Sequence, residues 1–359
     1  MTSMQPVQLG ANQPRQFYKG GPSIAELRGM AGSDEFGPED WVASATPRFG
    51  RGDDGLTTMP DGRYLRDLLE ADPQGWLGPE HVEYFGSDPA LLVKLLDAGQ
   101  RLPVHVHPDR AFAVRHLGSR HGKTEAWVVL GTSGSDPVVY VGWRRDVEQP
   151  ELSRLVAEQD TQSLLGLLNK LTVAPGDAVL VPAGTAHAIG AGVFSLELQE
   201  PTDFSIMLEL EGFDIDPAGA YVGLDRKLAL SCVSRRALGD RDLEQVTLEG
   251  DRGAAVGSSA SGPAGGVVDV LPEAAAPYFR AQRVVGGGEV NLEPSFAVVV
   301  AAAGEGRLRG SGWEVPVKRG DTLVVPWGAG DVSVEGPVEL LRCLPPLPVD
   351  AAKDDPGAG

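Results

Sequence analysis

The sequence predicts a mainly β protein made of two similar β domains in tandem, with a helical segment attached to the first. Three observations predict this fold. Short runs of β-branched and aromatic residues recur along the chain between Gly, Pro and Asp residues. One turn motif occurs twice, and leucines fall at helix spacing in two long stretches. The 47 glycines and 28 prolines of the 359-residue chain supply the turns that many short strands need.

The expected strands occur in both halves of the chain. Those of the first half read PVHVHP, TEAWVVLG, PVVYVGW, DAVLVPAG and GVFSLELQ. Those of the second half read QRVVGGGEVNL, SFAVVVAAAG, GWEVPV, DTLVVPWG and VELLRCL. Short strands at regular spacing with Gly and Pro turns are typical of sandwich or barrel domains.

Two stretches have a helical period instead. Residues 64–96 include LRDLLE and LLVKLLDAG, and residues 147–171 read VEQPELSRLVAEQDTQSLLGLLNKL. Apolar residues at three- and four-residue intervals predict helices over both stretches.

The turn motif G-D-x4-P-x-G-x2 occupies residues 176–187 and again residues 320–331. His187 ends the first copy and Asp331 ends the second. A repeat at this scale predicts two domains, which we place at residues 1–250 and 267–348. The acidic, Gly/Ala-rich stretch around residues 250–266 is interpreted as a linker or long loop between them, and residues 349–359 as a disordered tail.

Charge and composition exclude several classes of protein. The chain has 31 Lys and Arg against 50 Asp and Glu, a net charge of −19, so we expect no nucleic-acid partner. No apolar run is long enough to predict a membrane span, and the first residues have no apolar core, so we expect no secretory signal and a cytoplasmic location. The two cysteines, Cys232 and Cys343, are interpreted as ordinary buried thiols, because their spacing fits no zinc ribbon or disulfide framework.

The histidines are concentrated in the first half of the chain. His105 and His107 are two residues apart in VHVH, a spacing that puts both imidazoles on one face of a strand. Glu125 begins another expected strand, and His187 ends the first turn motif. Three imidazoles and a carboxylate that converge inside a barrel would suit Zn²⁺, Fe²⁺, Mn²⁺ or Co²⁺, whereas a purely structural role for these side chains is the alternative. The second repeat has no HxH, so we expect one metal ion, in the first domain only.

The order HxH, Glu, G-x5-P-x-G-x2-H resembles the cupin signature. Together with the flanking sequence, this motif resembles the short bacterial branch of the type I mannose-6-phosphate isomerases over residues 18–345. The segments that carry this resemblance are GPSIAEL, EDWVAS, ALLVKLLDAGQRLPVHVHPD, HGKTEAW, VAPGDAVLVPAGTAHAIGAGVFSLELQEPTD and GDTLVVPWG. The resemblance implies two tandem cupin barrels (double-stranded β-helix, jelly-roll), with helical insertions and a metal site in the first barrel and no metal site in the second.

The resemblance also assigns roles to residues. It implies that His107, Glu125 and His187 bind the metal ion, and that His105, usually Gln in the family, is a fourth and stronger ligand. Zn²⁺ is the expected ion. Lys123 matches the active-site lysine of the family, and His121 and Asp109 are secondary catalytic candidates because they are close in sequence to the ligands.

The implied reaction is a metal-dependent aldose–ketose isomerisation through a cis-enediol, in which Lys123 either transfers the proton or orients the substrate. The expected partner is a sugar or sugar phosphate, and the protein is expected to be a monomer or homodimer. Two alternatives remain: a non-catalytic sugar-binding or regulatory cupin, and an Fe²⁺-dependent cupin oxygenase.

One departure from the family bears on the substrate. Short members carry an arginine about ten residues after the glutamate of E-L-Q, and here Met207 takes that place, counted from Glu197. Because this arginine is associated with the anionic substrate, the sugar is either mannose 6-phosphate bound weakly or a related sugar, phosphorylated or not. A basic cluster of Arg110, Arg115, Arg120 and Lys123 is a candidate to compensate.

Overall fold

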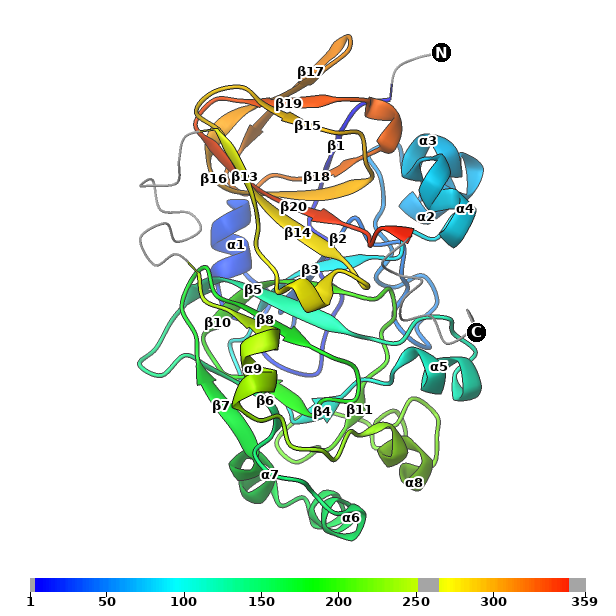
Figure 1. The fold of residues 1–359 in the computed structure, drawn as a ribbon, viewed down its shortest axis with the longest axis vertical. Helices are drawn as coiled ribbons and strands as arrows, with labels where there is room; N and C mark the ends of the chain where they lie inside the picture. Colours follow the sequence, from blue (N-terminus) through cyan, green and yellow to red (C-terminus); the bar gives the residue numbers. More distant parts are fainter. Residues whose placement is uncertain (1–3, 251–264, 349–359) are drawn as a thin grey trace.

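The structure is a computed structural model that describes residues 4–250 and 265–348 (Figure 1). It consists of three β-sheets with short helices around them, so the prediction of a mainly β protein is confirmed. A central sheet has the strand order β12-β8-β5-β10-β3-β2, and a second sheet of the N-terminal half has the order β11-β4-β9-β6-β7. The third sheet follows β1-β18-β16-β20-β14-β13, with β15, β17 and β19 joined to it.

The strands are short, as their turn-rich sequence predicts. Up to the start of the second half they are β1 (Val7–Leu9), β2 (Glu39–Val42), β3 (Leu92–Asp97), β4 (His105–Val106), β5 (Glu125–Thr132), β6 (Val138–Trp143), β7 (Leu168–Thr172), β8 (Ala178–Val181), β9 (His187–Ile189), β10 (Val193–Gln199), β11 (Ile206–Met207) and β12 (Thr247–Leu248). The others are β13 (Gly266–Asp269), β14 (Arg280–Val285), β15 (Val290–Leu292), β16 (Ala297–Gly310), β17 (Trp313–Lys318), β18 (Thr322–Val325), β19 (Val332–Glu335) and β20 (Val338–Leu344).

The helices lie around the sheets. They are α1 (Ser23–Arg28), α2 (Leu65–Ala71), α3 (Pro73–Leu77), α4 (Pro79–Phe85), α5 (Arg110–His116), α6 (Gln149–Glu158), α7 (Thr161–Leu167), α8 (Arg226–Ala229), α9 (Asp240–Val246) and the 3₁₀ turns η1 (Leu230–Cys232), η2 (Glu273–Ala275) and η3 (Trp327–Ala329). No helix in the described parts of the chain has the length and hydropathy that crossing a membrane would require.

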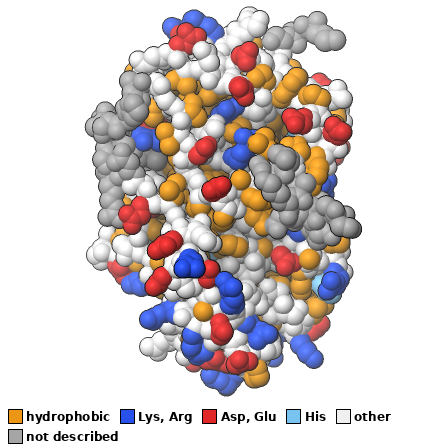
Figure 2. Space-filling view, viewed as in Figure 1, with side chains coloured by type: hydrophobic (Ala, Val, Ile, Leu, Met, Phe, Trp, Pro, Cys, Tyr) orange, Lys and Arg blue, Asp and Glu red, His pale blue; other side chains and the backbone are white. Residues whose placement is uncertain are grey.

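The surface carries charges of both signs. On the face shown in Figure 2, acidic and basic side chains lie next to one another over the end of the molecule that holds α6. Exposed ion pairs at this end include Arg145 with Glu151 and Arg154 with Glu158.

The side chains of the central sheet alternate between two apolar cores. Ala126 and Val128 of β5 pack in one core together with residues of the third sheet, such as Val298. Trp127 and Val129, one position along, pack in a core with residues of the second sheet. Because successive side chains of a strand point to opposite faces, every second residue of this sheet is directed into the interior of the N-terminal half.

The two copies of the turn motif have the same backbone arrangement. Gly176 and Gly320 adopt φ angles of +97° and +91°, a region that side chains disfavour. The Asp177 carboxylate accepts a hydrogen bond from the backbone N–H of Ala174 at 2.8 Å, and Asp321 accepts one from Lys318 at 2.9 Å. Each turn leads into a buried strand, β8 or β18, so the repeated sequence produces a repeated structure.

The helix predicted over residues 64–96 is correct only in its first part. Residues up to Phe85 form α2, α3 and α4, but LVKLLD forms β3, which lies between β2 and β10 in the central sheet. All six residues of β3 are buried. A strand covered on both faces is a continuous apolar run, which cannot be distinguished from a buried helix by periodicity alone.

The second helical prediction, over residues 147–171, is confirmed for α6 and α7. Gln159, with a φ angle of +53°, ends α6, and the last residues of the stretch form β7 instead of helix. The predicted tail and nearly all of the predicted linker lie outside the described residues. The predicted domain limits stay a prediction, and β1 near the N-terminus pairs with β18 of the C-terminal half.

Candidate metal centre

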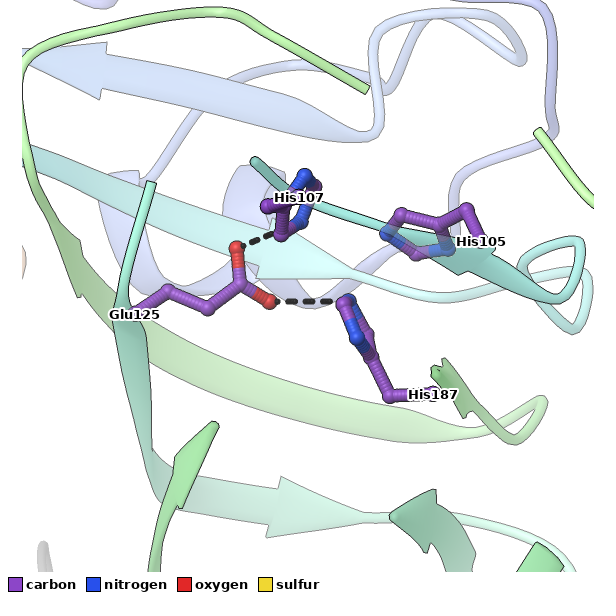
Figure 3. A group of neighbouring side chains, drawn as sticks. All are labelled: His105, His107, Glu125 and His187. Carbon is purple, nitrogen blue, oxygen red and sulfur yellow. Dashed lines mark ion pairs between the residues drawn. The ribbon is translucent and has the colours of Figure 1, made fainter. Parts of the chain in front are cut away.

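Four predicted ligands from three segments of the N-terminal half lie together. His105 begins β4 and pairs in register with His187, which begins β9. His107 follows β4, and Glu125 begins β5 in the facing central sheet. One ligand atom from each of the four residues lies within 4.8 Å of the others, and all four residues are buried (Figure 3).

Each imidazole is fixed by a backbone carbonyl. Nδ1 lies 2.8 Å from the Pro103 oxygen in His105, 2.7 Å from the Phe204 oxygen in His107 and 2.7 Å from the Thr185 oxygen in His187. A carbonyl can only accept, so Nδ1 carries the proton and Nε2 presents a lone pair. This arrangement orients metal-binding histidines in many proteins.

The electrostatics of the cluster fit a divalent cation. Burial, reinforced by the Lys123 charge, lowers the pKa of His107 to about 3, and burial beside His187 and His107 lowers the pKa of His105 well below its usual value. Burial tends to raise the pKa of Glu125, but Lys123 and His107 outweigh it and hold that pKa well below its usual value. Neutral imidazoles and an ionised carboxylate are the states that bind metal ions.

His187 provides a direct test of this fit. Its Nε2 atom is buried and has no hydrogen-bond partner among the described residues, and it lies 3.3 Å from a Glu125 oxygen (Figure 3). A buried polar atom without a partner is costly, and a cation would satisfy it.

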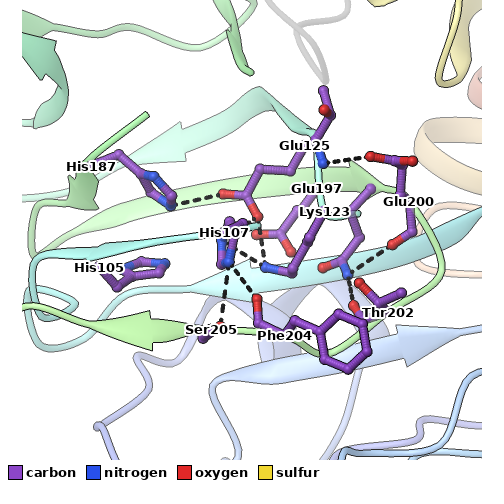
Figure 4. Close-up of polar contacts among 12 residues, drawn as sticks. His105, His107, Lys123, Glu125, His187, Glu197, Glu200, Thr202, Phe204 and Ser205 are labelled. Atoms are coloured by element: carbon purple, nitrogen blue, oxygen red, sulfur yellow. Dashed lines mark hydrogen bonds and ion pairs between the residues drawn. The ribbon is translucent and has the colours of Figure 1, made fainter. Parts of the chain in front are cut away.

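Lys123 lies beside the cluster. Its Nζ atom is 2.7 Å from Glu125 Oε2 and 2.9 Å from His107 Nε2 (Figure 4). The loop that carries it is anchored: the Thr124 N–H donates to the Glu200 carboxylate at 2.8 Å, and the Thr202 hydroxyl donates to the Gly122 carbonyl at 2.6 Å. A Cβ atom at Gly122 would lie 2.6 Å from the Pro108 oxygen, so this close approach requires glycine.

A polar cavity adjoins the cluster. Its lining includes Met207 and several polar side chains, namely Gln16, Tyr18, Glu39, Lys94, His105, Lys123, Glu125, Glu197, Asp203 and Ser205. Lys94 lies 3.2 Å from Glu197 and 3.4 Å from Glu39, and all three are buried. Burial raises the pKa of Glu197, which keeps this carboxyl group closer to protonation than an exposed glutamate.

Lys94, Glu39 and Tyr18 are not among the site residues predicted from the sequence, where Glu197 serves only as the point from which Met207 is counted. Lys94 is the one charged residue within an apolar run, and a charge inside a buried strand is rarely placed without a partner. Once β3 is recognised as a strand, this lysine is a signal that the sequence does contain. The pairing of Lys94 with Glu197 depends on the register of β3 and β10, which the sequence does not reveal.

The three predicted catalytic residues lie in different places. Lys123 lines the cavity. Asp109 is exposed and caps α5 by accepting a hydrogen bond from the Phe112 N–H at 2.7 Å. His121 is buried with its Nε2 atom 2.7 Å from Asp88, and neither Asp109 nor His121 is part of the cavity lining among the described residues.

Known proteins of one family are similar to this chain. Residues 278–345 match the model of the mannose-6-phosphate isomerase cupin domain. The chain is 26% identical to mannose-6-phosphate isomerase of Streptococcus mutans over 94% of its length and 97% of that protein, and 26% identical to ManA, a mannose-6-phosphate isomerase of Bacillus subtilis, over 90% and 93%. The chain is thus similar to mannose-6-phosphate isomerases along almost its whole length.

Solved structures of family members share the fold. The crystal structure of the Bacillus subtilis mannose 6-phosphate isomerase superposes with a TM-score of 0.70 at 24% identity, covering 95% of this chain and 99% of that one. A putative mannosephosphate isomerase from Archaeoglobus fulgidus gives a TM-score of 0.71 at 21% identity, covering 96% and 99%. The resemblance inferred from the cupin motifs is therefore confirmed along almost the whole chain.

Proposed function

We propose that this protein is a metal-dependent aldose–ketose isomerase that interconverts mannose 6-phosphate and fructose 6-phosphate, or a closely related sugar pair. The observation that carries the proposal is the cavity itself, because His105 and Glu125 of the buried cluster line it together with Lys123 and Glu197. Relatives that match the chain along nearly their whole length are named mannose-6-phosphate isomerases.

One divalent ion, for which Zn²⁺ is our proposal, would be held by His105, His107, Glu125 and His187. The ion would supply Lewis-acid polarisation of the sugar carbonyl. The protein contributes a fixed geometry, because the carbonyl contacts at Nδ1 orient the imidazoles before any substrate binds.

The reaction moves one proton between C1 and C2, so a group that accepts and returns it must line the cavity. Lys123 and Glu197 both do so, which favours them over His121 and Asp109. Lys123 is already bonded to Glu125 and His107, an arrangement suited to orienting substrate oxygens. Glu197 has a raised pKa and is buried in the cavity wall, which suits a carboxylate that exchanges a proton.

We further propose that the two halves are tandem cupin barrels and that only the first binds metal. The strand register supports this, since Glu125 pairs with Val181 before the first P-x-G turn, whereas Ala297 pairs with Val325 before the second. An alanine offers no ligand at the matching place. We propose a cytoplasmic enzyme that works as a monomer or homodimer.

Elemental analysis of purified protein, followed by a coupled assay of mannose 6-phosphate isomerisation, tests this function. We expect one zinc per chain and isomerase activity that a chelator abolishes and zinc restores. Sugar binding without turnover would indicate the non-catalytic cupin instead. Iron dependence with consumption of O₂ would indicate the oxygenase.

A further inference from the structure

The cavity lining holds four carboxylates against two lysines, and both lysines are committed. Lys94 lies between Glu39 and Glu197, and Lys123 contacts Glu125 and His107. Met207 stands in the lining where the family carries an arginine. Among the described residues, the lining thus offers no uncommitted cation to an anionic group on the substrate.

The basic cluster proposed from the sequence lies away from this cavity, except for Lys123. Arg110 on α5 donates to Glu200 at 2.7 Å and lies over the Tyr278 ring. Arg120 is exposed and lies over the Phe85 ring, and Arg115 is exposed in the last turn of α5. None of these three arginines lines the cavity, so a phosphate-binding residue must come from another part of the chain.

Arg48 lies directly behind the cavity wall. Its Nη2 atom donates to the Gln16 side-chain oxygen at 3.2 Å, and Gln16 lines the cavity. The next residue, Phe49, donates its backbone N–H to the carboxylate of Asp203, another lining residue, at 3.2 Å. The Phe49 ring packs edge-on against Phe204 with centroids 5.4 Å apart. Residues 48 and 49 thus form hydrogen bonds with two residues that line the cavity, Gln16 and Asp203.

The guanidinium of Arg48 is only partly satisfied. Its Nε atom is buried and has no hydrogen-bond partner among the described residues. Nη1 contacts Asp54 at 3.0 Å, in a pair whose side chains are 15% and 43% exposed, so solvent weakens that attraction. A buried N–H without an acceptor is unfavourable, so this side chain has a donor available for an oxygen of a ligand. Arginine suits phosphate because its planar fork can donate two parallel hydrogen bonds.

We propose that Arg48 binds the phosphate group of the sugar substrate and replaces the arginine that is absent at position 207. This inference rests on the proposed function and names the residue that recognises the substrate's anionic end. His105 and Glu125 line the same cavity as Gln16 and Asp203, the two residues that residues 48 and 49 contact, so the proposed phosphate site adjoins the predicted metal ligands.

The test compares two sugars on metal-loaded, full-length protein. Arg48→Ala should lower kcat/KM for mannose 6-phosphate by about ten- to a hundredfold, the loss expected for one charge-assisted contact. Isomerisation of free mannose should change by less than about twofold. Arg48→Lys should keep part of the preference for the phosphorylated sugar, because it keeps the charge but loses the fork. Arg63→Ala is the matched control, since Arg63 forms an exposed pair with Asp61.

Calorimetric titration with mannose 6-phosphate and with mannose gives a second readout that does not need turnover. We expect Arg48→Ala to weaken only the binding of the phosphorylated sugar, and Met207→Arg in that background to restore part of it. Equal losses for both sugars would make Arg48 a structural residue and overturn the inference. Unchanged binding of mannose 6-phosphate by the Arg48→Ala variant would also overturn the inference. The same holds if the wild type binds mannose 6-phosphate no more tightly than mannose. A wild type that binds mannose 6-phosphate through Arg48 but isomerises neither sugar would refute the proposed function alone.

Discussion

The two halves of this protein share their framework and differ in the side chains directed into it. Gly176 and Gly320 donate their backbone N–H groups to Val129 and Ala301, each at 2.8 Å, so the turns sit at the same place on their neighbouring strands. The register then aligns Glu125 with Ala297, as described above. Backbone turns and inward-facing side chains can thus vary independently.

The same alignment extends to the cavity wall. Glu197 pairs with Trp127 on one side and Lys94 on the other, and Arg342 holds the matching place between Val299 and Gln282. The pocket beside Arg342 is lined mostly by aliphatic residues of the C-terminal half, such as Val299 and Leu340. Different side chains at a few inward-facing positions therefore distinguish the candidate catalytic centre of one half from the aliphatic core of the other.

The largest expected effect is on the metal. His107→Ala removes an imidazole whose orientation the Phe204 carbonyl fixes, so metal content and isomerase activity should both fall by more than about a hundredfold. Elemental analysis and the coupled assay measure the two losses. Asp331→Ala, in the second copy of the turn, is the control and should keep one metal per chain. Full metal content in the His107 variant would reassign this ligand.

Glu197→Gln should reduce kcat by about 10²–10⁴-fold while metal content is retained, because the amide cannot exchange a proton. In the wild type, kcat should rise as the pH increases through the raised pKa of Glu197, since burial moves that pKa above the ordinary 4.5 and the base must be ionised. The matched variant in the other half, Arg342→Gln, should leave kcat unchanged. If kcat were unaltered in the Glu197 variant, Lys123 would be the remaining candidate for the group that transfers the proton.

Substitution of the two turn glycines should separate backbone strain from packing. Both Gly176→Ala and Gly320→Ala force a side chain into positive φ, at a cost of about 1–3 kcal/mol in the free energy of unfolding. Gly320→Ala should cost more, because its Cβ atom would lie 2.0 Å from the Leu27 carbonyl oxygen, whereas the nearest atom at Gly176 is 3.5 Å away. Urea denaturation measures both. A larger loss of stability for Gly176→Ala than for Gly320→Ala would mean that α1 does not pack against the turn at Gly320.

The smallest effect is expected for Asp331→His, which copies the last residue of the first turn into the second. Asp331 is exposed whereas His187 is fully buried, so stability should change by less than about 0.5 kcal/mol. Metal content should stay at one ion per chain, because Ala297 supplies no carboxylate. If elemental analysis detected a second bound ion, the C-terminal half would be able to bind metal even though Ala297 takes the place of Glu125 there.

Much of the fold and the cluster could be predicted from the sequence, for reasons specific to these residues. The strands bounded by Gly and Pro were found because their turns are encoded locally. The cluster of His105, His107, Glu125 and His187 was found because a strand's two-residue period and the turn motif fix where these side chains point.

The rest depends on long-range pairing. The sequence of β3 predicts a helix because both faces of this strand are covered, which leaves a continuous apolar run. Strands as short as β9 and β11 have too few residues to show a pattern. Lys94, Glu39 and Glu197 come together through the register of β2, β3 and β10, and Arg48 reaches the wall through Gln16. No local pattern specifies such contacts, since they depend on which strands become neighbours.

The pairing of β1 with β18 has a consequence for how the chain folds as it is synthesised. Val7 lies opposite Val324, so this segment leaves the ribosome long before its partner strand is synthesised. Until then, the first residues have no sheet to join, and β18 emerges with one edge still open. An open strand edge invites pairing with other chains. This pairing thus joins segments that are far apart in the sequence, and a variant that lacks β1 would leave the edge of β18 open and be prone to aggregation.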